Sequence, residues 1–326
     1  MNTITMLLLD ILLSASLLSL VWATLTTAEA RRSIILFIAL GLVLALIWAR
    51  LLAPDVALAE AAIGAGLSGA LLLTAVGQQP RQILLKNGAN KTIQDKRNVK
   101  DSILRISIRS MVSLFCIALA AILAWSLLLA FDNNNDSVAQ AVSANLSSSG
   151  VSNPVTAVLL NFRAYDTLLE LAVLLTAVLG IFALSEERER YQPAGPVFAG
   201  LVSWLVPMLV LVAGYLLWVG AHAPGGAFQA GATLAAAGVV LRLAGKSDIG
   251  LPHGNLLHLI LVIGVAIFLL VGLSMLALGR DFLAYPPALA GSLILLIETA
   301  AMFSIAATLV LAFLGGRAKI TGDKTC

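Results

Sequence analysis

Residues 255–278 read NLLHLILVIGVAIFLLVGLSMLAL, a run that contains no Asp, Glu, Lys or Arg. A membrane-spanning helix needs about 20 mostly apolar residues, so this stretch predicts a helix that crosses a lipid bilayer. Similar runs lie at about 5–27, 33–52, 54–77, 109–131, 155–184, 197–220, 226–244 and 287–314. The run 155–184 is too long for one straight helix. We expect its first part, from Asn153 to Arg163, either to lie along the membrane interface or to be broken.

The composition excludes a soluble enzyme. Of the 326 residues, 60% are hydrophobic and 11% are charged, whereas a soluble globular domain is about 25% charged. The runs are too long and too uniformly apolar for the alternating pattern of a membrane barrel. We therefore expect an all-α, polytopic membrane helix bundle with about nine transmembrane helices. The net charge of +3 gives no indication of nucleic-acid binding, and two cysteines without a CxxC motif indicate no disulfide or metal site.

The positive charges predict an orientation. Residues 4–27 are interpreted as a retained helix, because Arg31 and Arg32 follow the apolar stretch, whereas a secretory signal carries its positive charges before it. With the N-terminus outside and the C-terminus inside, 17 of the 20 Lys and Arg residues fall on the inner side. Positive residues concentrate on the cytoplasmic side of membrane proteins. This distribution favours that topology. We expect a multi-pass protein of the bacterial cell inner (plasma) membrane.

Carboxylates within the spans are candidate functional residues, since a charge at the membrane centre costs about 2.5–3.5 kcal/mol on insertion scales. Asp166 and Glu170 are four residues apart and share one helix face, with Arg163 on the same stripe. Such a pair can hold a proton or a hydrated cation, with its pKa tuned by burial against the arginine. The alternative is a structural Arg–Asp pair that stabilises a broken helix.

Three more sites carry ionisable groups of this kind. Glu60 lies deeper in the third span than Asp55, which could sit at the interface, and the face beyond Glu60 holds small residues that permit close helix packing or leave room for water. Glu298 lies in the middle of the last span, where it either handles ions or makes a structural hydrogen bond. His222 could carry a proton, or it could be a structural residue of the turn that follows it. Asp10 is interpreted as structural or interfacial.

All seven lysines lie outside the predicted spans. The large antiporter-like subunits of respiratory complexes use lysines inside the membrane as proton relays. This chain therefore cannot supply such a relay by itself.

The turn after the sixth span reads PGGAFQAG at residues 224–231, with His222 just before it. It resembles the PGGGFQGG signature of the MnhB/MrpB subunit of multisubunit Na+/H+ antiporters. Two glycines of that signature are Ala227 and Ala230 here, which argues against extreme backbone dihedrals at those positions. The residues that match the signature are Pro224, Gly225, Gly226, Phe228, Gln229 and Gly231.

Two upstream motifs point to a second subunit of the same complexes. Residues 53–60, APDVALAE, resemble a PDVALTE-like motif in the C-terminal region of the MrpA subunit, a region shared with small membrane subunits of energy-converting hydrogenases. Residues 161–170, NFRAYDTLLE, are similar to the DFRGFDTLGE motif of that region. Arg163, Asp166, Thr167 and Glu170 are kept, while Asn161 and Leu169 depart from the motif.

The resemblance implies four segments: an MrpA-tail-like three-helix domain at 1–80, a basic cytoplasmic linker at 81–108, a two-helix domain at 109–190 and an MnhB/MrpB-like four-helix domain at 195–317. It implies a non-enzymatic subunit of a Na+/H+ antiporter without a cofactor, with Na+ and H+ as the transported ions. Asp55, Glu60, Asp166 and Glu170 would belong to the ion path. The other Mrp/Mnh-type subunits would be partners, including a large one that carries intramembrane lysines.

Two other readings remain open. The same module occurs in redox-coupled complexes such as membrane-bound hydrogenases, and partner subunits with iron–sulfur or nickel ligands would distinguish these. A structural scaffold is the other reading, in which the charges only hold helices together. A stand-alone transporter is disfavoured, because the sequence has no obvious internal repeat and many transporters are built from repeats.

Overall fold

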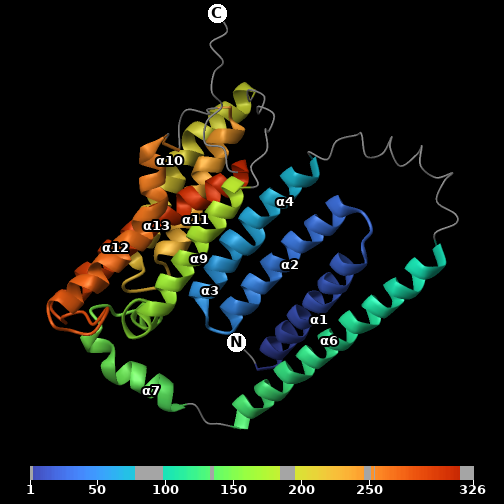
Figure 1. Ribbon diagram of the computed structural model, residues 1–326, viewed down its shortest axis with the longest axis horizontal. Coiled ribbons are helices and arrows are strands. Elements are labelled where there is room, and N and C mark those ends of the chain that lie inside the picture. Colours follow the sequence, from blue (N-terminus) through green and yellow to red (C-terminus); the bar gives the residue numbers. More distant parts are fainter. Residues whose placement is uncertain are drawn as a thin grey trace, which may run out of the picture. The chain divides into compact units, whose positions relative to one another are not determined.

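The computed structural model describes residues 3–77, 98–132, 136–183, 195–245, 251–252 and 254–315. Within these ranges the regular structure is helical and contains no strand, as the sequence predicts. The chain divides into two compact units (Figure 1), the first formed by residues 1–76 and 144–326 and the second by residues 77–143.

The N-terminal part of the first unit is three antiparallel helical segments in sequence order (Figure 1): α1 (Thr3–Thr26), α2 (Ala30–Arg50), and α3 (Pro54–Ala59) continued by the π-helix η1 (Glu60–Leu67) and α4 (Ser68–Gly77). Pro54 begins α3, a position where proline's missing N–H removes no helical hydrogen bond. The small residues beyond Glu60 serve close packing. A Cβ built on Gly41 of α2 would lie 3.0 Å from the Cβ of Ala65, and one on Gly69 would overlap the Ile38 side chain.

The long predicted run 155–184 is broken, which was one of its two predicted alternatives. It forms α8 (Pro154–Ala157), the π-helix η3 (Val158–Phe162) and α9 (Ala164–Ala183). Asn153 caps α8 by accepting a hydrogen bond from the Val155 N–H at 3.0 Å. Arg163, with φ −129° and ψ 34°, separates η3 from α9.

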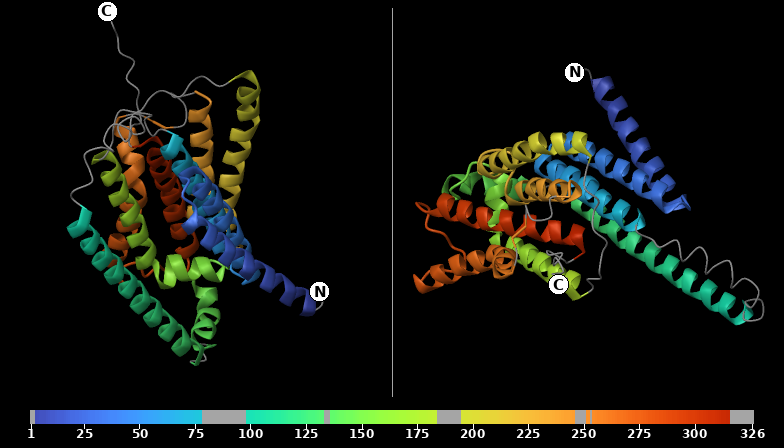
Figure 2. Two further views of the ribbon diagram at one scale, coloured as in Figure 1. Left: turned by 90° about the vertical axis from the view of Figure 1, so that its right-hand side faces the viewer. Right: turned by 90° about the horizontal axis from the view of Figure 1, so that it is seen from above.

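Four long helices form the rest of this unit: α10 (Pro196–Val219), α11 (Ala227–Leu243), α12 (Asn255–Ala277) and α13 (Ala290–Leu314). α13 packs against α9, α11 and α12 (Figure 2) and is the most buried of them. Glycines let its neighbours approach closely: a Cβ on Gly264 of α12 would lie 2.9 Å from the Ser304 Cβ. The Ser304 hydroxyl donates to the Leu261 carbonyl of α12 at 2.7 Å.

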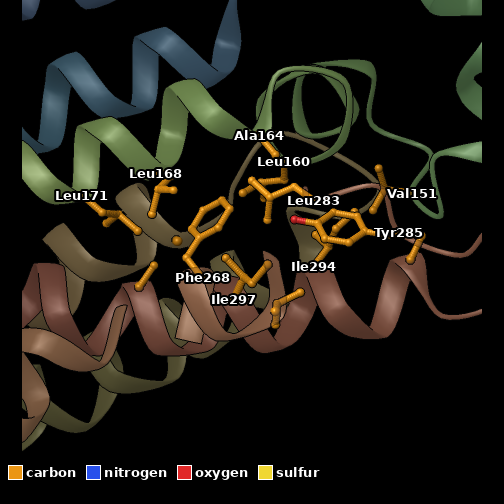
Figure 3. Close-up of a cluster of buried hydrophobic side chains, with 14 of the residues drawn as sticks. Val151, Leu160, Ala164, Leu168, Leu171, Phe268, Leu283, Tyr285, Ile294 and Ile297 are labelled. Carbon is orange, nitrogen blue, oxygen red and sulfur yellow. The ribbon is translucent and has the colours of Figure 1, made fainter. Parts of the chain in front are cut away.

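The core of the unit lies where α9, α12 and α13 meet (Figure 3). Phe268 and Ile297 are completely buried there, and Leu160 and Leu168 pack on them. Tyr285, from the connection between α12 and α13, belongs to the same cluster. These contacts place η3 and α9 against the middle of α13.

Seven helices of the described residues are long and apolar enough to cross a membrane: Ile4–Thr26, Ala30–Arg50, Pro54–Val76, Ala164–Ala183, Pro196–Val219, Asn255–Ala277 and Ala290–Leu314. Shorter apolar helices cover Met111–Ser126 and Ala227–Leu243. Large apolar side chains, such as Leu211 and Trp204, are exposed on these helices, as lipid contact requires. The chain is a multi-pass membrane protein. The count of nine spans and the orientation remain predictions.

The second unit contains α6 (Asn98–Asp132) and most of α7 (Asp136–Asn145). The apolar part of α6 coincides with the predicted run 109–131 and is exposed along residues 111–126. The predicted linker 81–108 lies mostly outside the described residues, as do His253 and Cys326.

Candidate functional site

The glycine-rich turn between α10 and α11 has a conformation that requires glycine. Gly226 precedes α11 with φ 107° and ψ −173°, a region of backbone space that is essentially restricted to glycine. Its N–H donates to the Leu216 carbonyl at 2.9 Å, which folds the turn back onto the end of α10. Ala227 and Ala230, which replace glycines of the signature, lie in α11 without positive φ. The alanines are therefore compatible with this turn, as expected.

Asp55 fixes the turn from α3. Its carboxylate Oδ1 accepts a hydrogen bond from the Gly225 backbone N–H at 3.0 Å, and its backbone carbonyl accepts one from Gln229 Nε2 at 3.1 Å. Asp55 and Gln229 are each only 9% exposed. The Asp55 carboxylate and the turn therefore satisfy each other in a place shielded from solvent.

The segment before α8 holds the other side of the turn. Asn153 Nδ2 donates to the carbonyls of Gly220 and Ala223, at 3.3 and 3.1 Å. The Thr156 hydroxyl donates to the Gly220 carbonyl at 2.6 Å. The beginnings of α3, α8 and α11 thus meet at one end of the bundle.

Glu298 reaches the turn from the middle of α13. It is only 3% exposed, and its Oε1 accepts a hydrogen bond from the Ala227 N–H at 3.3 Å. This N–H belongs to the first turn of α11, where backbone donors have no partner within the helix and the helix dipole favours negative charge. The second oxygen, Oε2, is buried without a hydrogen-bond partner among the described residues.

Asp55, Glu298 and the turn line a cavity of about 230 Å³. Its other walls are mostly apolar and include Phe228 and Phe268. A volume of this size exceeds the need of a single water several-fold. The cavity therefore joins two acidic side chains that are distant in sequence. The remaining lining residues are Val56, Ala59, Val155, Thr156, Leu159, Leu160, Thr167, Gly225, Gly226, Ala227, Gln229, Ile297 and Ala301.

The stripe on α9 lies elsewhere. Arg163 and Asp166 form an ion pair, with side chains 70% and 45% exposed, and Glu170 is exposed one turn further along. None of these three lines the cavity. The sequence placed them on one helix face, and the structure puts that face on the outside of the described unit, where lipid or a partner subunit would contact it.

Glu60 and His222 lie near the cavity without lining it. Glu60 begins η1 and is half-buried, and its carboxylate lies over Gly64, where an added Cβ would overlap it. The exposed His222 places Nδ1 3.0 Å from the Ser152 hydroxyl oxygen. His222 is therefore held in part by the segment before α8.

Sequence reasoning missed three features of the site. Gln229 was assigned to the signature, but nothing in its position predicts that it binds the Asp55 carbonyl. Thr156 and Phe268 carry no local signal, because a threonine or phenylalanine in an apolar run is ordinary. Only their packing around the cavity distinguishes them.

Three family comparisons cover most of the chain. Residues 15–81 match the MbhD family and residues 97–199 match the MbhE family, both described as subunits of MBH. Residues 197–315 match the MnhB family, described as a domain related to the MnhB subunit of Na+/H+ antiporter. The resemblance to an Mrp/Mnh-type subunit fused from small subunits is confirmed. No curated protein matches the chain.

A solved structure, described as the Mrp complex from Dietzia sp. DQ12-45-1b, contains a chain with the same fold. The TM-score is 0.67 at 21% sequence identity, and the match covers 94% of this chain and 34% of that chain. The chain thus spans about a third of the length of the Mrp-complex chain that it resembles.

Every matched segment contributes to the cavity. Asp55 comes from the MbhD-like segment and Thr156 and Thr167 come from the MbhE-like segment. The turn and Glu298 come from the MnhB-like segment. The site therefore exists only where the three segments are assembled.

Proposed function

We propose that the chain is a subunit of a multisubunit monovalent cation (Na+)/proton antiporter of the Mrp type. It contributes membrane-embedded carboxylates to the ion path and binds other subunits. One observation carries the proposal: segments similar to MbhD, MbhE and MnhB converge on a single cavity that is lined by two buried carboxylates. Each carboxylate accepts one backbone N–H of the turn region, from Gly225 and from Ala227, and burial of a charged group costs more than those single hydrogen bonds return.

The proposed ion path has two parts. The first is the cavity with Asp55 and Glu298, flanked by Glu60 and by His222 at the exposed edge of the turn. The second is the stripe on α9, where Arg163 holds Asp166 and leaves Glu170 to bind an ion. With the N-terminus outside, the beginnings of α3, α8 and α11 face outward, so the cavity receives protons that the membrane potential drives inward.

The remaining machinery comes from partners. All lysines of this chain lie outside the predicted spans, so the intramembrane lysines of the proton relay belong to a large antiporter-like subunit. The exposed face of α9 is a surface for such subunits, because an uncovered Glu170 in lipid would cost a few kcal/mol. The chain acts as a transporter subunit in the bacterial inner membrane, with Na+ and H+ as cargo and no cofactor.

The test is ion exchange in membrane vesicles that contain the whole complex. The variant Glu170→Gln keeps the size of the side chain and removes its charge, so we expect assembly to persist and exchange of Na+ for protons to stop. Glu29→Gln is the matched control, because Glu29 lies at the start of α2, outside both parts of the path. Normal exchange in Glu170→Gln would rule out its assigned role.

The second candidate is a membrane subunit of an energy-converting hydrogenase or a related redox-coupled pump. The matches of residues 15–81 and 97–199 to MBH subunits favour it. Affinity purification of the intact complex distinguishes the two. Co-purifying subunits with iron–sulfur or nickel centres would support the redox complex, and their absence together with vesicle exchange would support the antiporter.

A further inference from the structure

We propose that the cavity beside the glycine-rich turn is a proton site, in which Glu298 takes up a proton from cavity water and returns it. This inference rests on the proposed function, since it names the ion that this part of the path handles. The observation behind it is that the two oxygens of the buried Glu298 carboxyl group have different surroundings.

The Glu298 carboxyl is arranged for two protonation states. Oε1 accepts the Ala227 N–H in either state, and a carbonyl oxygen and a carboxylate oxygen both suit that donor. Oε2 has no protein partner among the described residues, so it is the oxygen free to bind a proton. Uptake forms one O–H bond at Oε2 with a proton from a hydronium ion, and release returns that proton to water. No electrons are transferred.

The two states differ in what they need from the cavity. The neutral carboxylic acid fits apolar walls such as Phe268 and Ile297, whereas the carboxylate requires hydrogen-bond donors for its exposed lone pairs. The first turn of α11 supplies one donor, and water in a cavity of about 230 Å³ supplies the others. Deprotonation of Glu298 is thereby coupled to hydration of the cavity.

The lining favours a proton over a metal cation. Ca²⁺ and Mg²⁺ in proteins are surrounded by six or more oxygen ligands, which include carboxylates, carbonyls and water. Here Asp55 Oδ1 already accepts the Gly225 N–H, and the hydroxyls of Thr156 and Thr167 donate to the carbonyls of Gly220 and Leu159. The rest of the wall is almost entirely hydrocarbon. Among the described residues, Glu298 Oε2 is the carboxyl oxygen of the lining that is fully buried without a partner. One such oxygen in largely hydrocarbon surroundings suits a proton and offers few ligands to Na+.

Within the described residues, few ionisable groups face Glu298 across the cavity. Asp55, from α3, is the other ionisable group of the lining. The parts of α8, η3, α9, α11 and α12 that face the cavity present uncharged side chains, and α13 adds none besides Glu298. Because Asp55 is held by the turn through two hydrogen bonds, it acts here as a positioning residue, and Glu298 is the carrier.

The experiment is infrared difference spectroscopy of the reconstituted complex between acidic and alkaline pH, with and without Na+. We expect a carboxylic-acid band that disappears on alkalinisation, shifts in deuterated water and is absent in Glu298→Gln. Addition of Na+ at constant pH should leave it unchanged. Glu298→Asp retains a titrating carboxyl group, so a shifted band should return, while Glu29→Gln should keep the wild-type band.

Transport is measured on the same preparations. Loss of a positioned proton-transfer group lowers a rate by roughly 10²–10⁴-fold, so exchange in Glu298→Gln should fall by at least the lower factor and recover partly in Glu298→Asp. An unchanged band in Glu298→Gln, a band that Na+ removes at constant pH, or normal exchange in that variant would each overturn the proton site. If the wild-type complex exchanges no cation for protons, the proposed function is wrong. In that case the carboxylic-acid infrared band still shows by itself whether Glu298 takes up and releases a proton.

Discussion

Asp55 Oδ1 accepts a hydrogen bond from the backbone N–H of Gly225 at 3.0 Å, although 170 residues separate them in the chain. Both residues are buried. The bond joins the MbhD-like segment to the signature turn of the MnhB-like segment. It therefore connects two parts of the chain that are similar to separate subunits elsewhere.

Removal of this carboxylate should destabilise the fold. Asp55→Ala leaves the Gly225 N–H buried without an acceptor, which costs about 1–3 kcal/mol. Unfolding of the purified protein in mixed micelles, titrated with a denaturing detergent, measures the change. Asp55→Asn retains an oxygen acceptor and should lose less. Equal losses for the two variants would show that the charge, rather than the hydrogen bond, stabilises the turn.

A side chain at Gly226 should damage both the backbone and the carboxyl site. The observed φ of 107° disfavours any other residue, with a cost of about 1–3 kcal/mol. A Cβ built there would also lie only 2.8 Å from Glu298 Oε1. Gly226→Ala should therefore lower stability and displace Glu298, with loss of its infrared band. Gly214→Ala is the control, because a Cβ on this α10 glycine meets nothing within 4 Å; if the two variants behave alike, the turn is not strained.

The first helix should depend on one ion pair. Arg50 Nη2 donates to Asp10 Oδ2 at 3.0 Å and links α2 to α1, and no residue of the described α1 is buried. A double-mutant cycle of Asp10→Ala and Arg50→Ala should give a coupling of about 1 kcal/mol, within the range for charged residues in contact. Unfolding in mixed micelles measures it. Arg31→Ala in place of Arg50→Ala should give no coupling.

Tyr285 should make stability fall at alkaline pH. Burial raises the pKa of its phenol, and its hydroxyl has no hydrogen-bond partner among the described residues. The unfolded chain loses this proton near pH 10, whereas the folded chain retains it to higher pH. The unfolded state therefore binds fewer protons above about pH 10, and the free energy of unfolding decreases there as pH rises.

Tyr285→Phe tests this account. It should remove that part of the alkaline decrease, and it should raise stability at neutral pH by about 1 kcal/mol, since a buried hydroxyl without a partner is unfavourable. Detergent unfolding at a series of pH values gives both quantities. Tyr215→Phe, at an exposed position on α10, should change neither. An alkaline decrease that persists in Tyr285→Phe would assign it to another group.

Local patterns predicted much of the architecture. Span boundaries such as 255–278 agree with α12 (Asn255–Ala277), because a membrane-spanning helix is one continuous run of apolar residues in the sequence. A broken first part of the run 155–184 was one of two predicted alternatives, because the run is longer than one span, and the structure places the break at Arg163. Asp166 and Glu170 were placed on one face correctly, because residues four apart in a helix are neighbours.

The sequence by itself determined that this chain spans a membrane, the approximate limits of long helices such as α12, and which motifs it shares with Mrp/Mnh-type subunits. Only the tertiary structure decided that Asp55 and Glu298 line one cavity with the turn at Gly226, while Glu170 faces outward. The physical reason is that hydropathy and helix periodicity act over a few neighbouring residues. The partner of a buried carboxylate is set by which helices pack together, and that choice depends on side-chain shape over the whole bundle.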